Sequence, residues 1–173
     1  LGERAKVSVT LNLSACVAQS DSEADRMAKH RNDLLSNEVF LGPMLDGAYD
    51  PEIFDVTTDY TDWSFIRDDD LKTIRQPVQC LGINYYSSTH VKGVTDPAEC
   101  ERRRNDHMQA VPAQDIVDAL PPEGELTDMG WNQEPRVLTE MLVGLAKRYP
   151  GLDLMVTENG SAWKDEVTED SSA

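Results

Sequence analysis

The sequence has no segment suited to spanning a membrane and little that would attract nucleic acid. No run of about 18 or more apolar residues occurs, which is the length that a membrane-spanning helix requires. Acidic residues number 32 and basic residues 16, and the resulting formal charge of −16 repels phosphate backbones. The one basic cluster, Arg102–Arg104, has acidic neighbours, and we interpret it as a solvated loop of mixed charge. We therefore expect neither a membrane nor nucleic acid as a partner.

Cysteine and histidine are also scarce. The three cysteines, Cys16, Cys80 and Cys100, are far apart and odd in number, so they match neither a disulfide framework nor zinc-ligand spacing. We expect buried free thiols, which are typical of a reducing compartment, and hence a cytoplasmic location. No basic and then apolar leader opens the chain, so no signal peptide is expected. No metal site is expected from the histidines, which are equally dispersed: His30, His90 and His107.

The chain does contain an alternation of apolar segments and amphipathic helices. Its composition, 39% apolar and 28% charged, is that of a soluble globular domain. Segments rich in β-branched, apolar or aromatic residues predict buried strands over 6–13, 78–86 and 152–157. Residues 44–76 give no strong periodic signal beyond a short helix near 68–74. The polar stretch 92–130 has little pattern, and loops of that length are usually functional or mobile.

Two helices are predicted between these strands. Ser20 and Glu23 have the spacing of a capping box, which opens a helix that should run to about Leu41. A second helix, 135–149, has a Pro in its first turn and ends at a Pro-Gly pair. The order strand, helix, strand, helix, strand predicts parallel strands joined by helical crossovers. Because three strands cannot close a barrel and a parallel sheet needs both faces covered, we expect 1–173 to be one incomplete α/β domain.

Polar side chains stand where two of the predicted strands end. Glu158 follows the third strand, and Asn84 and Tyr86 occupy the same place on the strand before it. In α/β proteins reactive side chains collect at such ends, and alternation puts Asn84 and Tyr86 on one face. A Tyr hydroxyl and an Asn amide can hold a carboxylate or a sugar hydroxyl. The spacing alone leaves other interpretations open, with Glu158 as a surface or capping carboxylate and Asn84 and Tyr86 as packing residues.

Three motifs resemble segments of one enzyme family. The first is Val-Thr-Glu-Asn-Gly at 156–160, and the second is Leu-Gly-Ile-Asn-Tyr-Tyr at 81–86. The third is Met-Gly-Trp at 129–131, followed by Pro135 and an amphipathic helix. These are similar to the Ile/Val-Thr-Glu-Asn-Gly signature, a Leu-Gly-Ile-Asn-Tyr-Tyr strand and the Met-Gly-Trp-Glu-x-x-Pro segment of glycoside hydrolase family 1. Their order and spacing agree with that family, and the resemblance extends over about 11–167.

The resemblance implies a partial (β/α)8 TIM barrel, of which this chain supplies roughly strands five to seven. It implies that Glu158 is the catalytic nucleophile of a retaining β-glucosidase and that Tyr86 hydrogen-bonds this carboxylate and fixes its position. By the same resemblance Asn84 shares the polar network, Asn12 approaches the sugar site, and Trp131 lines the aglycone side, where an indole face can stack. No cofactor or metal is implied, because two carboxyl groups carry the proton and covalent chemistry.

Glu134 looks similar to the family's acid/base residue but stands in the wrong place. It belongs to an Asn132-Gln-Glu-Pro string that resembles the family's Asn-Glu-Pro motif, yet it opens a helix instead of ending a strand. We interpret it as a first-turn carboxylate favoured by the helix dipole, and not as the general acid. The family usually has Glu where Asn132 stands, a departure that we expect to alter the aglycone end of the pocket.

The acid/base carboxylate is expected to lie before residue 1, and a Trp- and Glu-containing sugar-binding loop after residue 173. The chain alone should therefore not turn over ordinary substrates, since a retaining mechanism needs two carboxyl groups. Our leading hypothesis for the complete protein is a β-glucosidase that releases terminal non-reducing β-D-glucosyl residues from small β-glycosides or oligosaccharides. Side activity on β-galactosides or β-fucosides is compatible with this hypothesis, and the sequence does not indicate the oligomeric state.

Two alternatives stay open at this point. The first is a 6-phospho-β-glucosidase of the same family, whose distinguishing phosphate loop is expected beyond residue 173. The second is a catalytically inactive sugar-binding relative, because such proteins commonly lose one catalytic Glu. Retention of Glu158 argues against the second alternative, and the Asn-Glu-Pro strand before residue 1 would decide it.

Overall fold

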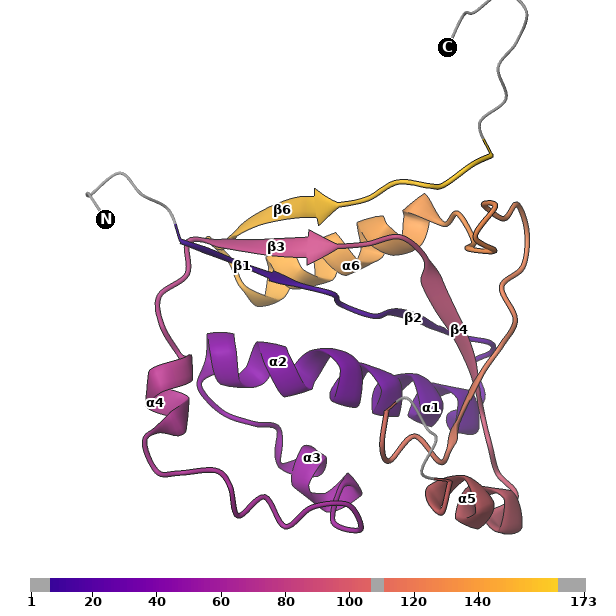
Figure 1. Cartoon of the computed structure of the whole chain (residues 1–173), viewed down its shortest axis with the longest axis horizontal. Coiled ribbons are helices and arrows are strands. Elements are labelled where there is room, and N and C mark those ends of the chain that lie inside the picture. Colours follow the sequence, from indigo (N-terminus) through magenta and orange to yellow (C-terminus); the bar gives the residue numbers. More distant parts are fainter. Residues whose placement is uncertain (1–6, 107–110, 165–173) are drawn as a thin grey trace, which may run out of the picture.

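The computed structural model describes residues 7–106 and 111–164. Its larger sheet has three parallel strands in the order β1-β3-β6, which span Ser8–Leu11, Cys80–Asn84 and Asp153–Glu158. Their carboxyl ends point to the same side, to the right in Figure 1. The three predicted strands are therefore confirmed as a parallel sheet. Lys6 of the first predicted strand and His107 lie outside the described residues.

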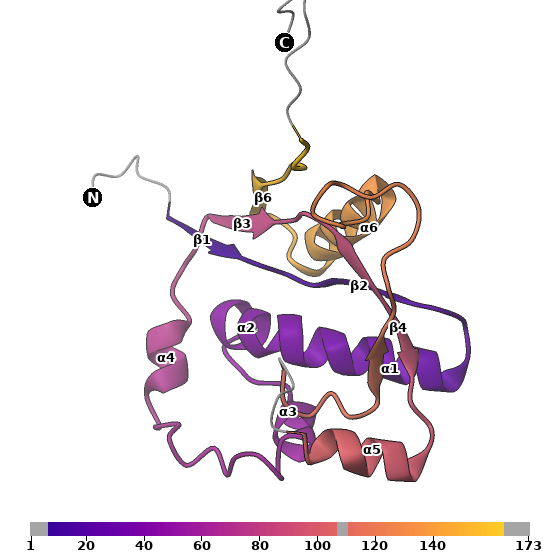
Figure 2. The ribbon, with the colours of Figure 1, turned by 45° about the vertical axis from the view of Figure 1, so that its right-hand side comes forward.

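A second, smaller sheet continues the first beyond its strand ends. β2 (Ala15–Ala18) follows β1, and β4 (Ser88–Gly93) follows β3, after short breaks in the strand. β2 and β4 pair in parallel, and β5 (Val117–Ala119) pairs antiparallel with β4. Figures 1 and 2 show β1 running on into β2 beside β3 running on into β4. The sequence predicts none of the strands of this smaller sheet.

The helix predicted after the first strand is present, but its geometry changes along its length. Ser22, and not Ser20, is the N-cap, because the Ser22 hydroxyl accepts a 3.1 Å hydrogen bond from the amide of Asp25. The helical segment runs beyond the expected end, and Gly47 closes it with a φ of 76°. Its four consecutive parts are α1 (Glu23–Asp33), a π-helical turn (Leu34–Glu38), α2 (Val39–Leu41) and a second π-helical turn (Gly42–Asp46).

Three short helices lie in the segments that gave little signal. They are α3 (Pro51–Val56), α4 (Asp70–Ile74) and α5 (Pro97–Arg104), and α4 agrees with the short helix expected there. The interpretation of Arg102–Arg104 as a solvated loop is wrong, because these residues form the last turn of α5. Arg103, for example, pairs with Glu99 of its own helix at 2.7 Å and with Asp118 of β5 at 3.0 Å. The arginines therefore fasten α5 to the smaller sheet.

One face of the larger sheet is covered by two helical segments. α6 (Pro135–Arg148) and the α1–α2 segment lie next to each other on this face, and Arg148 of α6 pairs with Glu38 of that segment. The apolar residues of α6 follow a helical period, so one stripe of the helix packs on the sheet. The buried core between the sheet and these helices consists of five aliphatic side chains: Leu13, Leu41, Leu81, Ile83 and Leu145.

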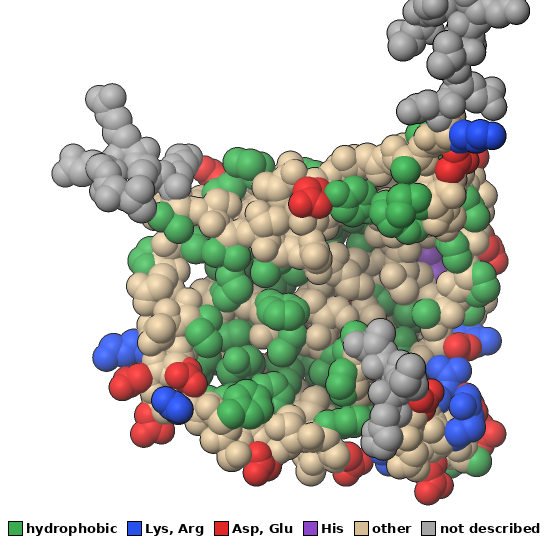
Figure 3. Space-filling model, in the orientation of Figure 1, with side chains coloured by type: hydrophobic (Ala, Val, Ile, Leu, Met, Phe, Trp, Pro, Cys, Tyr) green, Lys and Arg blue, Asp and Glu red, His purple; other side chains and the backbone are tan. Residues whose placement is uncertain are grey.

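The sheet does not close into a barrel within the described residues, since β1 and β6 are its two edges. The central strand β3 is buried, whereas β6 is mostly exposed, with Met155 52% and Val156 39% accessible to solvent. Figure 3 shows apolar side chains spread over one face of the molecule, with charged side chains mostly around its margin. A section of a barrel that lacks its neighbouring strands has these properties, in agreement with the predicted partial (β/α)8 fold.

The cysteines agree with the expectation of free thiols. Cys16 and Cys80 are buried, Cys100 is half-buried, and none of them is in a disulfide. Burial in the smaller sheet and the nearby Asp33 carboxylate raise the pKa of the Cys16 thiol to about 12. Within the described part of the chain, no helix combines the length and the apolar character that crossing a bilayer requires.

Candidate active site

Parallel pairing brings the predicted polar residues to one edge of the larger sheet. Asn84 ends β3 and lies opposite Glu158, which ends β6, while Asn12 directly follows β1. The register shifts by one residue between Ile83 and Asn84, so that Asn84 skips Thr157 and pairs with Glu158. This irregularity is a local bulge, a feature that re-aims side chains at strand ends. Side chains from three strands therefore meet at one edge.

Tyr86 and Glu158 are in direct contact. The Tyr86 hydroxyl donates a hydrogen bond to Glu158 Oε2 at 2.7 Å, which is the length of a bond to a charged acceptor. This bond raises the pKa of Tyr86 above its ordinary value, because the carboxylate favours the protonated phenol. The backbone supports the pair, since the Tyr85 amide donates to the carbonyl of Glu158 at 2.9 Å.

Asn84 belongs to a second array of side chains across the same edge. Its Nδ2 donates to Asn12 Oδ1 at 2.8 Å, and its Oδ1 accepts from the Thr157 hydroxyl at 2.8 Å. The array thus crosses all three strands of the larger sheet and fixes the orientation of the Asn84 amide. Thr157 is missing from the residues singled out in the sequence, although it stands inside the Val-Thr-Glu-Asn-Gly motif. Its side chain lies on the same face as Asn84, because alternation from the Gly82–Met155 pair carries both residues to that face.

An open cavity of about 480 Å³ lies against these side chains. It takes in the end of β1, the end of β3 and the end of β6, and it has room for a sugar ring. Phe40 of α2, which is 50% exposed, forms one wall, and sequence reasoning does not single out this residue. The full lining is Thr10, Leu11, Asn12, Phe40, Asn84, Thr157 and Glu158.

Trp131 reaches the site from the other side of Tyr86. The two rings are tilted by 51° with their centroids 5.3 Å apart, which is an ordinary aromatic contact. The Trp131 backbone is fixed by Thr127, whose hydroxyl accepts from the Trp131 amide at 3.2 Å and whose amide donates to the Trp131 carbonyl at 2.9 Å. The five residues proposed from the sequence are therefore all found at one end of the sheet.

Glu134 and Asn132 both contact β4. Glu134 is the N-cap residue of α6, one position before the predicted first turn, and its side chain makes no capping bond. The carboxylate accepts instead from the Ser88 hydroxyl and pairs with His90 Nε2 at 2.7 Å. The Ser88 bond, followed by His90, lowers the pKa of Glu134 although partial burial opposes this shift. The lowered pKa favours the ionised carboxylate, whose hydrogen-bond partners are Ser88 and His90.

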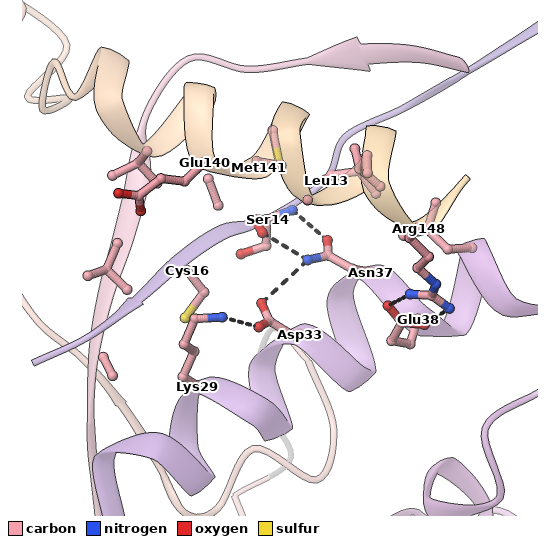
Figure 4. Close-up of a pocket in the computed structure, with 17 residues that line it drawn as sticks. Leu13, Ser14, Cys16, Lys29, Asp33, Asn37, Glu38, Glu140, Met141 and Arg148 are labelled. Carbon is pink, nitrogen blue, oxygen red and sulfur yellow. Dashed lines mark hydrogen bonds and ion pairs between the residues drawn. The ribbon is translucent and has the colours of Figure 1, made fainter. Parts of the chain in front are cut away.

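A further cavity, of about 400 Å³, lies away from these residues between α1 and α6 (Figure 4). Its polar groups bind one another, as in the ion pair of Arg148 with Glu38 at 2.5 Å. The side-chain amide of Asn37 accepts from the backbone N–H of Ser14 at 2.7 Å and donates to the Ser14 carbonyl at 2.9 Å. It thus bonds both backbone groups of Ser14, as a paired residue of a neighbouring strand does. Figure 4 shows this pairing, which fixes the chain shortly after Asn12. The lining of this cavity contains none of the predicted site residues.

Comparisons with known proteins agree with this arrangement. The family model described as glycosyl hydrolase family 1 matches residues 1–173. A bifunctional β-D-glucosidase/β-D-fucosidase of Bifidobacterium breve is 44% identical over 96% of this chain, and thermostable β-glucosidase B of Thermobispora bispora is 31% identical over 95%. The chain spans 34% and 32% of the lengths of these two relatives.

Solved structures show the same relation. The crystal structure of the β-glucosidase from Exiguobacterium antarcticum B7 superposes with a TM-score of 0.79 at 27% identity, and covers 95% of this chain. The psychrophilic β-glucosidase from Micrococcus antarcticus superposes with a TM-score of 0.78 at 29% identity, and covers 96%. The chain corresponds to 34% and 37% of those two proteins. This chain belongs to glycosyl hydrolase family 1 and represents about one third of the length of its relatives.

Proposed function

We propose that the complete protein is a retaining β-glucosidase in which Glu158 is the nucleophile. The observation that carries this proposal is the 2.7 Å bond from Tyr86 to Glu158 at the mouth of the sheet, beside a cavity lined by Asn12 and Asn84. One Glu158 oxygen attacks the anomeric carbon and forms a covalent glycosyl-enzyme, which water then hydrolyses. The Tyr86 hydroxyl holds the attacking carboxylate in one orientation, so that little freedom is lost on reaction.

The second carboxyl group of this mechanism lies outside the present chain in our proposal. It must protonate the leaving oxygen from a position about 5–5.5 Å from the nucleophile. Glu134 does not suit this role, because Ser88 and His90 already bind its carboxylate and keep its pKa low. A general acid needs the opposite, a raised pKa and a free proton.

The substrate we propose is an unphosphorylated β-D-glucoside, with β-D-fucosides as a second class. The names of the relatives support this choice, since they are a glucosidase/fucosidase and a β-glucosidase. Asn84 and Asn12 are suited to accept and donate hydrogen bonds to sugar hydroxyls. Trp131 offers an apolar surface for the aglycone. A cytoplasmic location stays a prediction that depends on the three free cysteines.

Glu158→Gln in the complete protein tests the assignment of the nucleophile. The amide cannot attack the anomeric carbon, so turnover of an aryl β-glucoside should fall by at least about 10⁴-fold, as for other covalent catalysts. Glu140→Gln on the exposed face of α6 removes a charge of the same kind and should leave the rate unchanged. Wild-type rates for Glu158→Gln would exclude this carboxylate as the nucleophile.

A further inference from the structure

Trp131 is carried by a short loop, residues 126–134, which we call the Trp131 loop. The loop is closed on itself by a bridge between Leu126 and Asn132 and by the bonds between Thr127 and Trp131. It also touches the segment after Glu158, where the Asp128 amide donates to the Ala162 carbonyl at 3.1 Å. Because the loop is internally fixed, the place of its indole ring depends on how its base is attached to the sheets.

The base of the loop is attached to β4 through two side chains. Asn132 is 2% exposed, and its amide accepts from the Ser88 amide at 3.0 Å and donates to the Ser88 carbonyl at 3.2 Å. Glu134 binds the Ser88 hydroxyl and His90, while its carbonyl accepts from the Tyr85 hydroxyl at 2.8 Å. The loop is thereby joined to the strand that directly follows the Asn-Tyr-Tyr segment of the site.

The Glu134 carboxylate serves this attachment and not its own helix. It caps no amide of α6, and its side chain is only 33% exposed beside a His90 side chain that is 34% exposed. Such a partly buried, charge-assisted contact is stronger than a surface ion pair. Loss of the carboxylate would leave Ser88 and His90 of β4 without their acceptor. The base of the loop would then be held to β4 only through Asn132.

We propose that Glu134 is a positioning residue for Trp131 and so determines how the enzyme holds the aglycone or an acceptor sugar. Trp131 lies close to the proposed nucleophile, because its ring contacts that of Tyr86 at 5.3 Å between centroids and the Tyr86 hydroxyl donates to Glu158. Glu134 does not touch the reacting atoms. The inference rests on the proposed function, since it assumes that the indole ring faces the leaving group.

The glycosyl-enzyme separates this role from the chemistry at Glu158. In the complete protein, a 2-deoxy-2-fluoroglucosyl inactivator leaves a long-lived adduct, whose release by water needs no aglycone contact. Release to an added acceptor, phenyl β-D-glucoside, does need that contact. For Glu134→Ala we expect release by water within about twofold of the wild type, and acceptor-assisted release weakened about tenfold, because misplaced binding groups cost rates of that order.

Three further variants make the test specific. Glu134→Gln should restore most of the acceptor effect, since its amide oxygen still accepts from Ser88. On a Trp131→Phe background Glu134→Ala should have little further effect, because both changes act through one side chain. Glu140→Ala, on the same helix and paired with Arg136, should match the wild type. If Glu134→Ala does not fold, Ser88→Ala replaces it as the variant that weakens the same attachment.

Other outcomes overturn the proposal. Unchanged acceptor-assisted release in Glu134→Ala would show that the attachment does not place Trp131. An equal loss of release by water would show that Glu134 acts on the nucleophile instead. Absence of any adduct in the wild type, by contrast, would refute the proposed function. Without an adduct there is no release to an acceptor, so this inference would be refuted with it.

Discussion

At the scale of single residues, the hydrogen bond between Tyr86 and Glu158 is the contact on which the site depends. It joins the two residues that the motifs single out most strongly, and it lies at the edge where the parallel strands end. The raised pKa of Tyr86 means that the folded chain holds this proton more tightly than the unfolded chain does. The bond is therefore fully present below the ordinary tyrosine pKa of about 10 and is lost as the pH rises above that of the folded state.

Tyr86→Phe should lower kcat/KM of the complete protein for aryl β-glucosides by about 10- to 100-fold. The estimate follows from the ~1.5–3 kcal/mol that a hydrogen bond to a charged group contributes, since the ring contact with Trp131 is retained. Tyr60→Phe is the control, because it removes a hydroxyl that donates to the Arg104 carbonyl at 3.2 Å away from the site. Equal kcat/KM values for the two variants would show that the Tyr86 hydroxyl does not contribute to the reaction.

The residues of the site differ in how far the sequence could have predicted them. Glu158, Tyr86 and Trp131 follow from motifs, because each belongs to a string whose order and spacing match one family. That Thr157 and Glu158 both reach the site could not be predicted, since it depends on a one-residue shift of register beside Ile83. Alternation along a regular strand would have pointed Thr157 to the opposite face from Glu158.

At the scale of elements, what the sequence predicted well were the long periodic helix and the apolar strands. The missed strand β4 contains Ser88, His90 and Lys92, so its pattern is that of a polar loop, and it forms because β2 and β5 pair with it. The missed helices α3 and α5 both begin with Asp-Pro, with the Asp side chain capping the helix. That dipeptide is the signal that could have predicted them.

The close approach of the three strands can be tested through glycine. A Cβ at Gly82 of β3 would lie 2.9 Å from Thr157 Cγ2 and closer still to the Thr10 hydroxyl, so Gly82→Ala should destabilise the complete protein by about 1–3 kcal/mol. In α6, a Cβ at Gly144 meets nothing within 4 Å, so Gly144→Ala should stabilise it by about 0.5–1 kcal/mol. Denaturant unfolding measures both free energies. Equal effects of the same sign would contradict the tight packing at Gly82.

At the scale of the whole molecule, the chain is a section of a larger barrel. It spans about a third of the length of its relatives, and its edge strands β1 and β6 lack outer neighbours in the described part. Met155, Val156 and Phe40 are all at least 39% exposed, although such side chains are usually covered. The sequence predicted this incompleteness from the small number of parallel strands and from the cover that a parallel sheet needs on both faces.

The 173-residue chain expressed alone should therefore be poorly packed. Unpaired strand edges and exposed apolar side chains favour association over a single compact state. We expect a broad thermal transition by calorimetry and no turnover of aryl β-glucosides, because only one of the two required carboxyl groups is present. A sharp cooperative melt of the monomeric chain would contradict the first expectation, and measurable turnover the second.

The central claim is that the carboxylate of Glu158 forms a covalent bond to the sugar. The direct measurement is inactivation of the complete protein with a 2-deoxy-2-fluoroglucosyl reagent, followed by proteolysis and mass spectrometry of the labelled peptide. The account predicts one sugar per molecule, attached to Glu158 between Thr157 and Asn159. A label on any other side chain, Glu134 included, would contradict it.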